Sequence, residues 1–285
     1  MKLILSLIPK EYSNIYENKY LLYFDTDEKK GHFLDIEVPQ NIYRANGMCY
    51  SGDVFVAALN TLYNESFLLM IKKNRGYVCS FLLNSAKVHD VVSASPGQLF
   101  LNSTEFDCMD KVTFNPNNLN VMENETHFSL NRYKKDLNHF SSLCCFNLKW
   151  YGALFGPDWS NEKDNGTVVD LTNKKVIYCN LKQPHSLFFN SEERICFCES
   201  ENSKFHFGNK IVKLFGYVRG AIEDKQKMGY WVAISKHRTN NERNKGIKGV
   251  HLVFVSYKGE ILDNINIDFF AEECYSIIEA HDYLI

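Results

Sequence analysis

Residues 219–235 have the sequence RGAIEDKQKMGYWVAIS, in which two strand-forming runs flank a polar turn. Four earlier segments share this layout: a polar or cationic residue opens the first run, and an aromatic residue or cysteine of the returning run follows about 11 residues later. They are 44–59 (RANGMCYSGDVFVAAL), 89–104 (HDVVSASPGQLFLNST), 139–156 (HFSSLCCFNLKWYGALFG) and 185–200 (HSLFFNSEERICFCES). The layout predicts an antiparallel strand pair that recurs along the chain.

The distance between successive repeats indicates what each one builds. The starting positions 44, 89, 139, 185 and 219 are 45, 50, 46 and 34 residues apart. Four short strands and their turns need about that length, so each repeat is predicted to be one blade of a β-propeller. No segment keeps a helical apolar period for three turns, which favours an all-β fold.

Both ends of the chain contribute to the predicted blade count. Five starts give five blades, from Arg44 to about Ile267, and the segment from Glu272 resembles the inner strand of a sixth. Three strand-like segments, 2–7, 20–25 and 32–38, are predicted to complete that blade from the N-terminus. This closure would leave no long exposed edge strand. We therefore expect a six-bladed propeller, a single domain over 1–285; a five-bladed propeller with a loose N-terminal region and a β-sandwich are the alternatives.

Composition excludes several classes of protein. The chain has 285 residues with 32 basic and 34 acidic side chains, a formal charge of −2, which argues against a general nucleic-acid binder. No apolar run approaches the roughly 20 residues of a membrane span, and the start lacks a secretory pattern. The nine cysteines are odd in number and lie in strand-like runs without zinc-site spacing. These features predict a cytoplasmic protein with reduced thiols.

An ordered series of short motifs follows in the second half of the chain. It comprises Trp159 to Lys163, Asn165-Gly166, Asp170, Pro184-His185-Ser186, Gly216 to Gly220, and Ser235 to Arg238. The series resembles a bacterial family of propeller-like proteins known as a conserved domain of unknown function, over roughly residues 44–280. The chain departs from that family at Ser276, where an aspartate is usual. The resemblance implies a bacterial protein with a propeller-like fold and brings no known reaction.

The topology places candidate functional residues at one mouth of the central channel. The starts of the inner strands should form a ring there, made of Arg44, His89, His139, His185, Arg219 and either Glu272 or Glu273. The ends of the second strands should bring Glu199, Ser235 and Arg238 to the same face, and a long loop should add Trp159 and Lys163. Ionisable groups gathered at one concave place are the default site for a ligand.

Three interpretations of His89, His139 and His185 remain open. Three imidazoles could bind one divalent metal, Zn²⁺ or Fe²⁺, and leave a position for water. They could instead act as acids, bases or hydrogen-bond donors toward an anion that Arg44 and Arg219 clamp. In the third interpretation each histidine only caps its blade. Glu199 is equally a candidate base, a candidate metal ligand or a solvated carboxylate.

The leading functional hypothesis is a propeller that binds a small polar or anionic ligand, sugar- or phosphate-bearing, at the channel mouth. His89, His139, His185 and Glu199 would make it a histidine-based or metal-dependent hydrolase, lyase or isomerase. Arg44, Arg219, Trp159, Lys163, Ser235, Arg238 and Glu273 would bind the ligand. The alternative is a non-catalytic propeller that docks a protein or glycan, because the fold does not fix the function.

Overall fold

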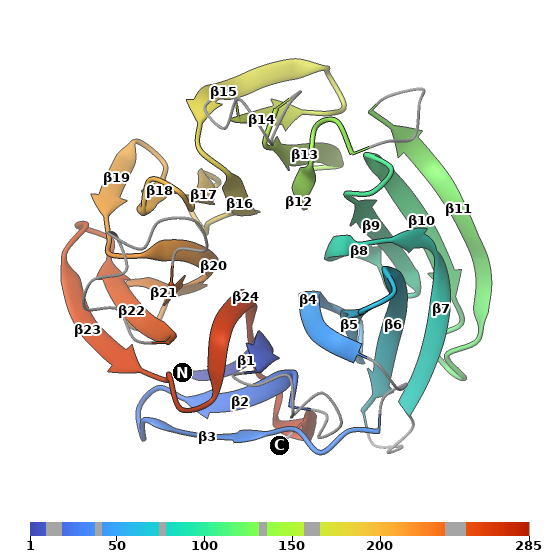
Figure 1. Cartoon of the computed structure of the whole chain (residues 1–285), viewed down its shortest axis with the longest axis horizontal. Helices are drawn as coiled ribbons and strands as arrows, with labels where there is room; N and C mark the ends of the chain where they lie inside the picture. The colour runs from blue at the N-terminus through green and yellow to red at the C-terminus, as the bar shows by residue number, and fades with distance from the viewer. Residues whose placement is uncertain are drawn as a thin grey trace.

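The computed structural model describes residues 1–9, 19–37, 42–73, 78–130, 136–156, 166–236 and 249–284. Their strands form six four-stranded antiparallel sheets arranged in a ring about a central axis (Figure 1). The predicted all-β, six-bladed propeller is confirmed, and the five-bladed and sandwich alternatives are wrong. A short 3-10 helix, η2 (Asp282–Leu284), follows the last strand.

The blades are numbered from the one that contains the first strand of the chain, β1, and each is described from its inner strand outward. Blade 1 contains β24 (Ala271–Glu279), β1 (Lys2–Pro9), β2 (Leu21–Asp25) and β3 (Lys30–Phe33). Blade 2 contains β4 (Ile42–Ser51), β5 (Val54–Thr61), β6 (Glu65–Lys72) and β7 (Val78–Ala86). Blade 3 contains β8 (Val88–Ser95), β9 (Gln98–Ser103), β10 (Cys108–Phe114) and β11 (Val121–Ser129).

The second half of the ring has the same order from the axis outward. Blade 4 contains β12 (Phe140–Phe146), β13 (Lys149–Leu154), β14 (Gly166–Asp170) and β15 (Lys175–Leu181). Blade 5 contains β16 (Pro184–Phe189), β17 (Ile195–Glu199), β18 (Lys204–Phe207) and β19 (Lys210–Lys213). Blade 6 contains β20 (Tyr217–Asp224), β21 (Gly229–Ser235), β22 (His251–Ser256) and β23 (Ile261–Asn266).

Blade 1 joins the two ends of the chain. β1 lies between β24 and β2, with Leu3 opposite Glu279 and Leu5 opposite Ile277. Leu3 and Leu5 are fully buried and, two residues apart in β1, lie on the same face of the sheet. The N-terminal strands therefore complete the blade begun by β24, which the sequence predicted as the sixth, although β3 begins and ends earlier than the expected segment 32–38.

A polar side chain near one end of a second strand repeatedly bonds the inner strand of the next blade. The amide of Asn60 on β5 donates to the carbonyl of Val88, and the amide of Asn102 on β9 donates to the carbonyl of Phe140. The other contacts of this kind are Ser6 to Asn46, Ser200 to Val218, and the N–H of Cys274 to Ser235. These buried bonds fasten neighbouring blades, because each joins a polar side chain of one blade to a main-chain group of the next.

Every inner strand interrupts its ladder at a corresponding position. The register shifts leave a few residues of each inner strand without a direct partner on the second strand. They are Asn46-Gly47, His89, Ser141, Ser186-Leu187, Arg219-Gly220 and Tyr275. A β-bulge redirects side chains, so this ring of bulges places side chains around the axis.

Gly47 marks the tightest contact between two inner strands. A Cβ at this position would lie 2.4 Å from the Cα of Asp90 and 2.6 Å from the nitrogen of Val91, both of them backbone atoms. We expect Gly47→Ala to destabilise the protein by about 1–3 kcal/mol, because β4 and β8 must move apart. Thermal unfolding measures this loss.

Gly52→Ala is the matched control. Its added Cβ would meet the nearest atom, of Pro96, at an ordinary 3.4 Å, so only the φ of +65° opposes the change. Its cost should be about 1 kcal/mol. A Gly47→Ala protein with the same melting temperature as the wild type would show that β4 and β8 can move apart without loss of stability.

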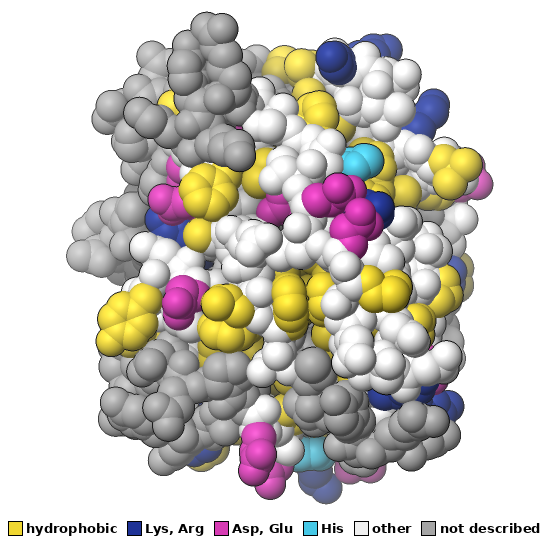
Figure 2. Space-filling view, turned by 90° about the vertical axis from the view of Figure 1, so that its right-hand side faces the viewer, with side chains coloured by type: hydrophobic (Ala, Val, Ile, Leu, Met, Phe, Trp, Pro, Cys, Tyr) yellow, Lys and Arg dark blue, Asp and Glu magenta, His cyan; other side chains and the backbone are white. Residues whose placement is uncertain are grey.

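The outer wall carries no broad apolar face where Figure 2 displays it. On the side of β7 and β11, hydrophobic side chains form a loose row among polar groups (Figure 2). Leu82 and Met122, on these strands, are 50% and 65% exposed. In the described part of the chain, no helix has the length and apolar character needed to cross a membrane.

Candidate functional site

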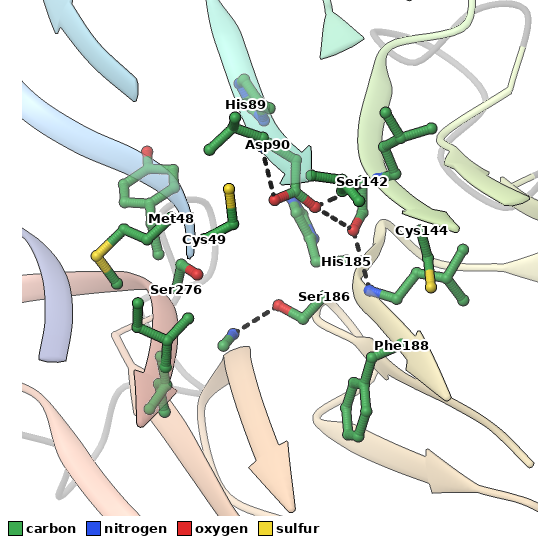
Figure 3. A pocket seen from close by; sticks show the side chains of 18 of the residues that line it. Met48, Cys49, His89, Asp90, Ser142, Cys144, His185, Ser186, Phe188 and Ser276 are labelled. Carbon is green, nitrogen blue, oxygen red and sulfur yellow. Dashed lines mark hydrogen bonds between the residues drawn. The ribbon is translucent and has the colours of Figure 1, made fainter. Parts of the chain in front are cut away.

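A cavity of about 320 Å³ lies on the axis of the ring, and all six inner strands line it. Its walls come from Met48 to Tyr50, His89 to Ser93, Ser141 to Cys145, His185 to Phe188, Arg219 to Ala221, and Tyr275 to Ile278. The bulged positions are prominent among these residues, which explains how strands with buried inter-blade faces also present polar groups to the axis. Figure 3 shows the side chains from close by.

Arg219 and His185 meet at one level of the cavity. Arg219 is 2% exposed, and its Nη2 lies 2.7 Å from Nε2 of His185. A guanidinium only donates, so Nε2 must accept and the imidazole carries its proton on Nδ1. Nδ1 lies 2.8 Å from Oγ of Ser200, whose hydroxyl in turn donates to the carbonyl of Val218. The histidine therefore fixes the orientation of Arg219.

A second arginine lies close by and shares a tyrosine with the first. Nη1 of Arg44 donates to the hydroxyl of Tyr275 at 2.9 Å, and the Tyr275 ring centre lies 4.0 Å from the guanidinium carbon of Arg219. Oε2 of Glu273 lies 3.7 Å from Nη1 of Arg219. We call Arg44, His185, Arg219 and Tyr275 the cation layer.

The cation layer has buried donors without acceptors. Nε of Arg44, and both Nε and Nη1 of Arg219, are inaccessible to solvent and have no hydrogen-bond partner among the described residues. Buried polar atoms are normally paired, and leaving one unpaired costs about 1–3 kcal/mol. Two arginines against Glu273 leave one uncompensated positive charge among these groups.

His89 and His139 lie beside this layer with different surroundings. Their rings are 5.2 Å apart, edge to face. Burial, and then the neighbouring charges of His139, Arg44, Arg219 and His185, hold the pKa of His89 well below its ordinary range. His89 is therefore a neutral imidazole near pH 7.

His139 stands just before β12, with a φ of +46° and its Nδ1 3.2 Å from Oδ2 of Asp136. The ring of Phe155 is 4.3 Å from the ring of His139 and 4.9 Å from that of His185. The sequence placed His139 as the first residue of the strand; the structure instead gives it a left-handed turn conformation. Phe155 packs against both imidazoles.

The described residues do not fit a metal centre. No group of three or more His, Cys, Asp and Glu side chains among them could hold a metal ion. Nε2 of His185, which a metal would need, accepts from a guanidinium. The proposed Zn²⁺ or Fe²⁺ site of His89, His139 and His185 therefore gains no support from the geometry, and no chemical step is derived through a metal.

Asp90 is a functional candidate that the sequence analysis did not select. Its carboxylate lies in the cavity between Cys49 and Ser142 (Figure 3). Oδ2 accepts from the hydroxyl of Ser142 at 2.8 Å and from the N–H of Leu143 at 3.2 Å, and Oδ1 accepts from the N–H of Val91 at 3.0 Å. Burial raises the pKa of Asp90 to about 6 against these three bonds, which lower it.

Hydrogen bonds link this position to the neighbouring blades. The N–H of Leu187 donates to Oγ of Ser142, and the N–H of Gly220 donates to Oγ of Ser186. Each bond joins a bulge to the inner strand of the preceding blade. We call Asp90, Ser142, Ser186 and Ser276, together with Cys49 and Cys144, the Asp90 layer; Ser186 and Ser276 directly follow His185 and Tyr275 of the cation layer.

The Asp90 carboxylate should make stability depend on pH. Its folded pKa of about 6 lies above the ordinary value of 3.8, so its contribution is complete below about pH 4 and is lost as pH rises toward about 6. An asparagine does not titrate. The stability of Asp90→Asn relative to wild type should therefore improve by on the order of 2–3 kcal/mol between about pH 4 and pH 7. Urea unfolding at both pH values measures this.

Asp170→Asn provides a control of opposite sign. Burial would raise the pKa of Asp170, but bonds from Asn173 bring it below the ordinary value, so its stabilisation is present at neutral pH and lost in acid. The stability of Asp170→Asn relative to wild type should worsen from about pH 4 to pH 7. The same trend in both variants would contradict the assignment for Asp90.

The remaining predicted site residues lie elsewhere. Glu199 is 2% exposed and bonds His206 at 3.0 Å, Lys204 at 3.4 Å and Asn202 within blade 5. Burial would raise its pKa, but these partners and the N–H of Lys182 lower it to about 2. Its carboxylate thus has partners inside the blade, and it does not line the axial cavity.

Ser235 acts as one of the inter-blade fasteners, because its Oγ accepts the N–H of Cys274 at 3.2 Å. Glu273 is near the arginines as expected. Trp159, Lys163 and Arg238 lie outside the described residues. The structure thus brings together Arg44, His89, His139, His185, Arg219 and Glu273 among the predicted site residues.

Comparisons with known proteins give the fold. No family model and no curated protein matches the chain; the resemblance to a bacterial family of unknown function is therefore supported only for the propeller. A periplasmic gluconolactonase of Pseudomonas aeruginosa has a similar structure, with a TM-score of 0.59, 10% identity, and coverage of 94% of this chain and 83% of that one.

Two further solved structures resemble this chain to a comparable degree. A luciferin-regenerating enzyme gives a TM-score of 0.59 at 12% identity, covering 83% of this chain and 79% of its own. Regucalcin of Agrobacterium tumefaciens, described as a calcium-binding protein, gives 0.54 at 11% identity, covering 80% and 75%. At these identities the likeness establishes the propeller and nothing finer.

Proposed function

We propose that the axial cavity binds a small anion, with a carboxylate or phosphate against the cation layer. The observation that carries this proposal is the set of buried guanidinium nitrogens of Arg44 and Arg219 without hydrogen-bond acceptors. An anionic oxygen is the acceptor that these donors lack, and guanidinium–oxyanion bonds are among the strongest that proteins form. Neutral His89 adds a ring nitrogen beside them.

The location of these donors favours a small ligand over a docked macromolecule. Arg219 is buried and lines a cavity of about 320 Å³, whereas a protein or glycan partner would contact the outer surface. The structural neighbours include a gluconolactonase and a luciferin-regenerating enzyme, both named for small molecules. A hydrolase, lyase or isomerase would act on this same bound anion.

Calorimetric titration with acetate, phosphate and sulfate, and with neutral acetamide, tests the proposal. At least one anion should bind and raise the unfolding temperature, because a ligand at 100 times its Kd stabilises by about 2.7 kcal/mol; acetamide should not bind. Arg219→Lys should weaken binding about tenfold or more, because lysine cannot reproduce the planar contact.

Arg194→Lys is the matched control, since its side chain is 56% exposed and pairs with Glu192 away from the cavity. This variant should bind as the wild type does. Absence of binding by all three anions, or equal affinity of the wild type and Arg219→Lys, would refute the proposed function and favour a protein-interaction propeller.

A further inference from the structure

Asp90 is an anion for which the described residues supply no cation. Its carboxylate receives three hydrogen bonds, all from neutral groups: the hydroxyl of Ser142 and the N–H groups of Leu143 and Val91. No Lys, Arg or His in the described part of the chain forms an ion pair with it. Its pKa of about 6 reflects burial opposed only by those three bonds.

The titratable groups that face Asp90 stay neutral. Cys49 on β4 and Cys144 on β12 lie on either side of it, and burial together with the Asp90 charge raises the pKa of both thiols, to about 12 for Cys144. His89, the preceding residue, has a pKa well below its ordinary range. None of these three side chains is therefore cationic near pH 7, and the Asp90 charge is uncompensated.

Uncompensated charges of opposite sign therefore lie at two consecutive positions: Arg219 and Asp90 line the cavity, and Arg44 lies beside it, bonded to Tyr275. The cation layer holds the arginine donors without acceptors. Ser186 and Gly220 of the next position directly follow His185 and Arg219, and one strand residue advances about 3.3 Å along the axis. A simple anion would compensate the positive charge and leave the Asp90 carboxylate buried without a cation.

We propose that the ligand is a small zwitterion, whose carboxylate meets the cation layer and whose ammonium group donates to the Asp90 carboxylate. This inference rests on the proposed function and adds the chemical class of the ligand. Oδ1 of Asp90 accepts the N–H of Val91 and retains lone pairs for an ammonium group. The volume of about 320 Å³ admits an amino acid and excludes a long peptide.

The side chains around Asp90 suit this ligand. Ser186 and Ser276 supply hydroxyl oxygens, and Met48, Cys49 and Cys144 supply weakly polar sulfur around a short carbon chain. The two charges lie at neighbouring positions on the inner strands, so we expect the carboxylate and ammonium groups to be separated by a short carbon chain. An amino acid whose carbon chain is too short or too long could bond either the cation layer or Asp90, but not both.

A length series of zwitterions and matched acids tests the proposal on the intact wild-type protein. The probes are glycine, β-alanine, γ-aminobutyrate, δ-aminovalerate and ε-aminocaproate, each paired by calorimetry near pH 7 with the straight-chain carboxylate of the same length. At the best length the amino acid should bind about tenfold or more tightly than its partner, because the ammonium–carboxylate bond is charge-assisted.

Asp90→Asn should abolish that tenfold advantage while changing the affinity for the plain carboxylate by only a few-fold. Asp170→Asn is the matched control, because Asp170 lies outside the cavity, and it should keep the advantage. An amine advantage that survives in Asp90→Asn would assign the ammonium group to another site and overturn the inference.

A second readout needs no variant. An ammonium group beside Asp90 lowers its pKa, so zwitterion binding near pH 6 should release protons from this carboxylate, seen as a buffer-dependent heat. A plain carboxylate near His89 raises the pKa of that imidazole and should release none. Equal proton release for both ligands would contradict the role of Asp90.

The failures of the two proposals are distinguishable. If carboxylates bind but no amino acid of any length binds more tightly than its partner, the zwitterion inference is wrong and the anion site stands. If neither carboxylates, phosphate, sulfate nor amino acids bind, both proposals are wrong.

Discussion

Removal of residues 1–40 is expected to leave a chain that does not fold. The deletion takes away β1, β2 and β3, so β24 loses its partner strand and blade 1 disappears. Among the buried apolar side chains that go with them are five of one core cluster: Leu3, Leu5, Leu7, Leu22 and Phe24. At about 1.5–3 kcal/mol each, this loss is comparable to the roughly 5–15 kcal/mol of total stability. Circular dichroism and soluble yield measure it.

A pair of single substitutions separates the loss of packing from the loss of chain. Leu5→Asp, at a fully buried position opposite Leu22 and Ile277, should unfold the protein almost as completely as the deletion. Lys2→Asp, at a half-exposed side chain of the same strand, should not. A soluble 1–40 deletion with an unchanged melting temperature would show that five blades and a lone strand suffice.

His185→Ala is expected to cost about 3 kcal/mol of stability, although its side chain is polar. The substitution removes the acceptor for Nη2 of Arg219, whose Nε and Nη1 already lack hydrogen-bond acceptors, so the buried guanidinium keeps few of its hydrogen bonds. The double variant His185→Ala/Arg219→Met should recover most of the loss, since removing both partners is far less costly than removing one. Urea unfolding of the four proteins gives the coupling energy.

Phe188→Ala, in the same strand, serves as the comparison for this cycle. Phe188 packs against Tyr230 and is not bonded to Arg219, so its effect should add to that of Arg219→Met. If His185→Ala and Arg219→Met are also additive, the imidazole does not hold the guanidinium and the proposed orientation of the cation layer is incorrect.

The repeat made the fold predictable from the sequence. The strand pairs beginning at Arg44, His89, His185 and Arg219 share the distance of about 11 residues to the returning strand, and the intervals between the starts indicated the blade length. His89, His185 and Arg219 line the axial cavity, whereas Arg44 lies beside it. The repeat spacing is a reliable guide to the fold, because every blade must bury both faces of its sheet against the neighbouring blades. The predicted ring of arginines and histidines followed from the same register.

Asp90 escaped the sequence analysis for a physical reason. Regular alternation sends consecutive strand residues to opposite faces, so selecting His89 implied that Asp90 pointed away. The bulge between Val88 and Asp90 breaks this alternation, and both His89 and Asp90 line the cavity. The dipeptide His89-Asp90 is plain in the sequence, but a single sequence carries no signal for the bulge that turns both side chains toward the axis.

For Glu199 the sequence predicted the position in the strand but not the partners of the side chain. Its place at the end of β17 was correctly predicted, but β18 runs back beside it and brings His206 within 3.0 Å of its carboxylate. The partner is set by the pairing of the two strands, which sequence spacing did not reveal. The direction of this side chain could not be predicted from the repeat.

Blade 1 also determines when the ring can close during synthesis. Because Leu3 of β1 pairs with Glu279 of β24, β1 is synthesised long before the strand that lies beside it in the ring. Until then β1 offers an unpaired apolar edge, the kind of surface that chaperones bind and that aggregates recruit. Joining such distant segments also carries a loop-closure entropy that slows the last step of folding. Circular permutants that make β24 and β1 consecutive should therefore refold faster than the native order.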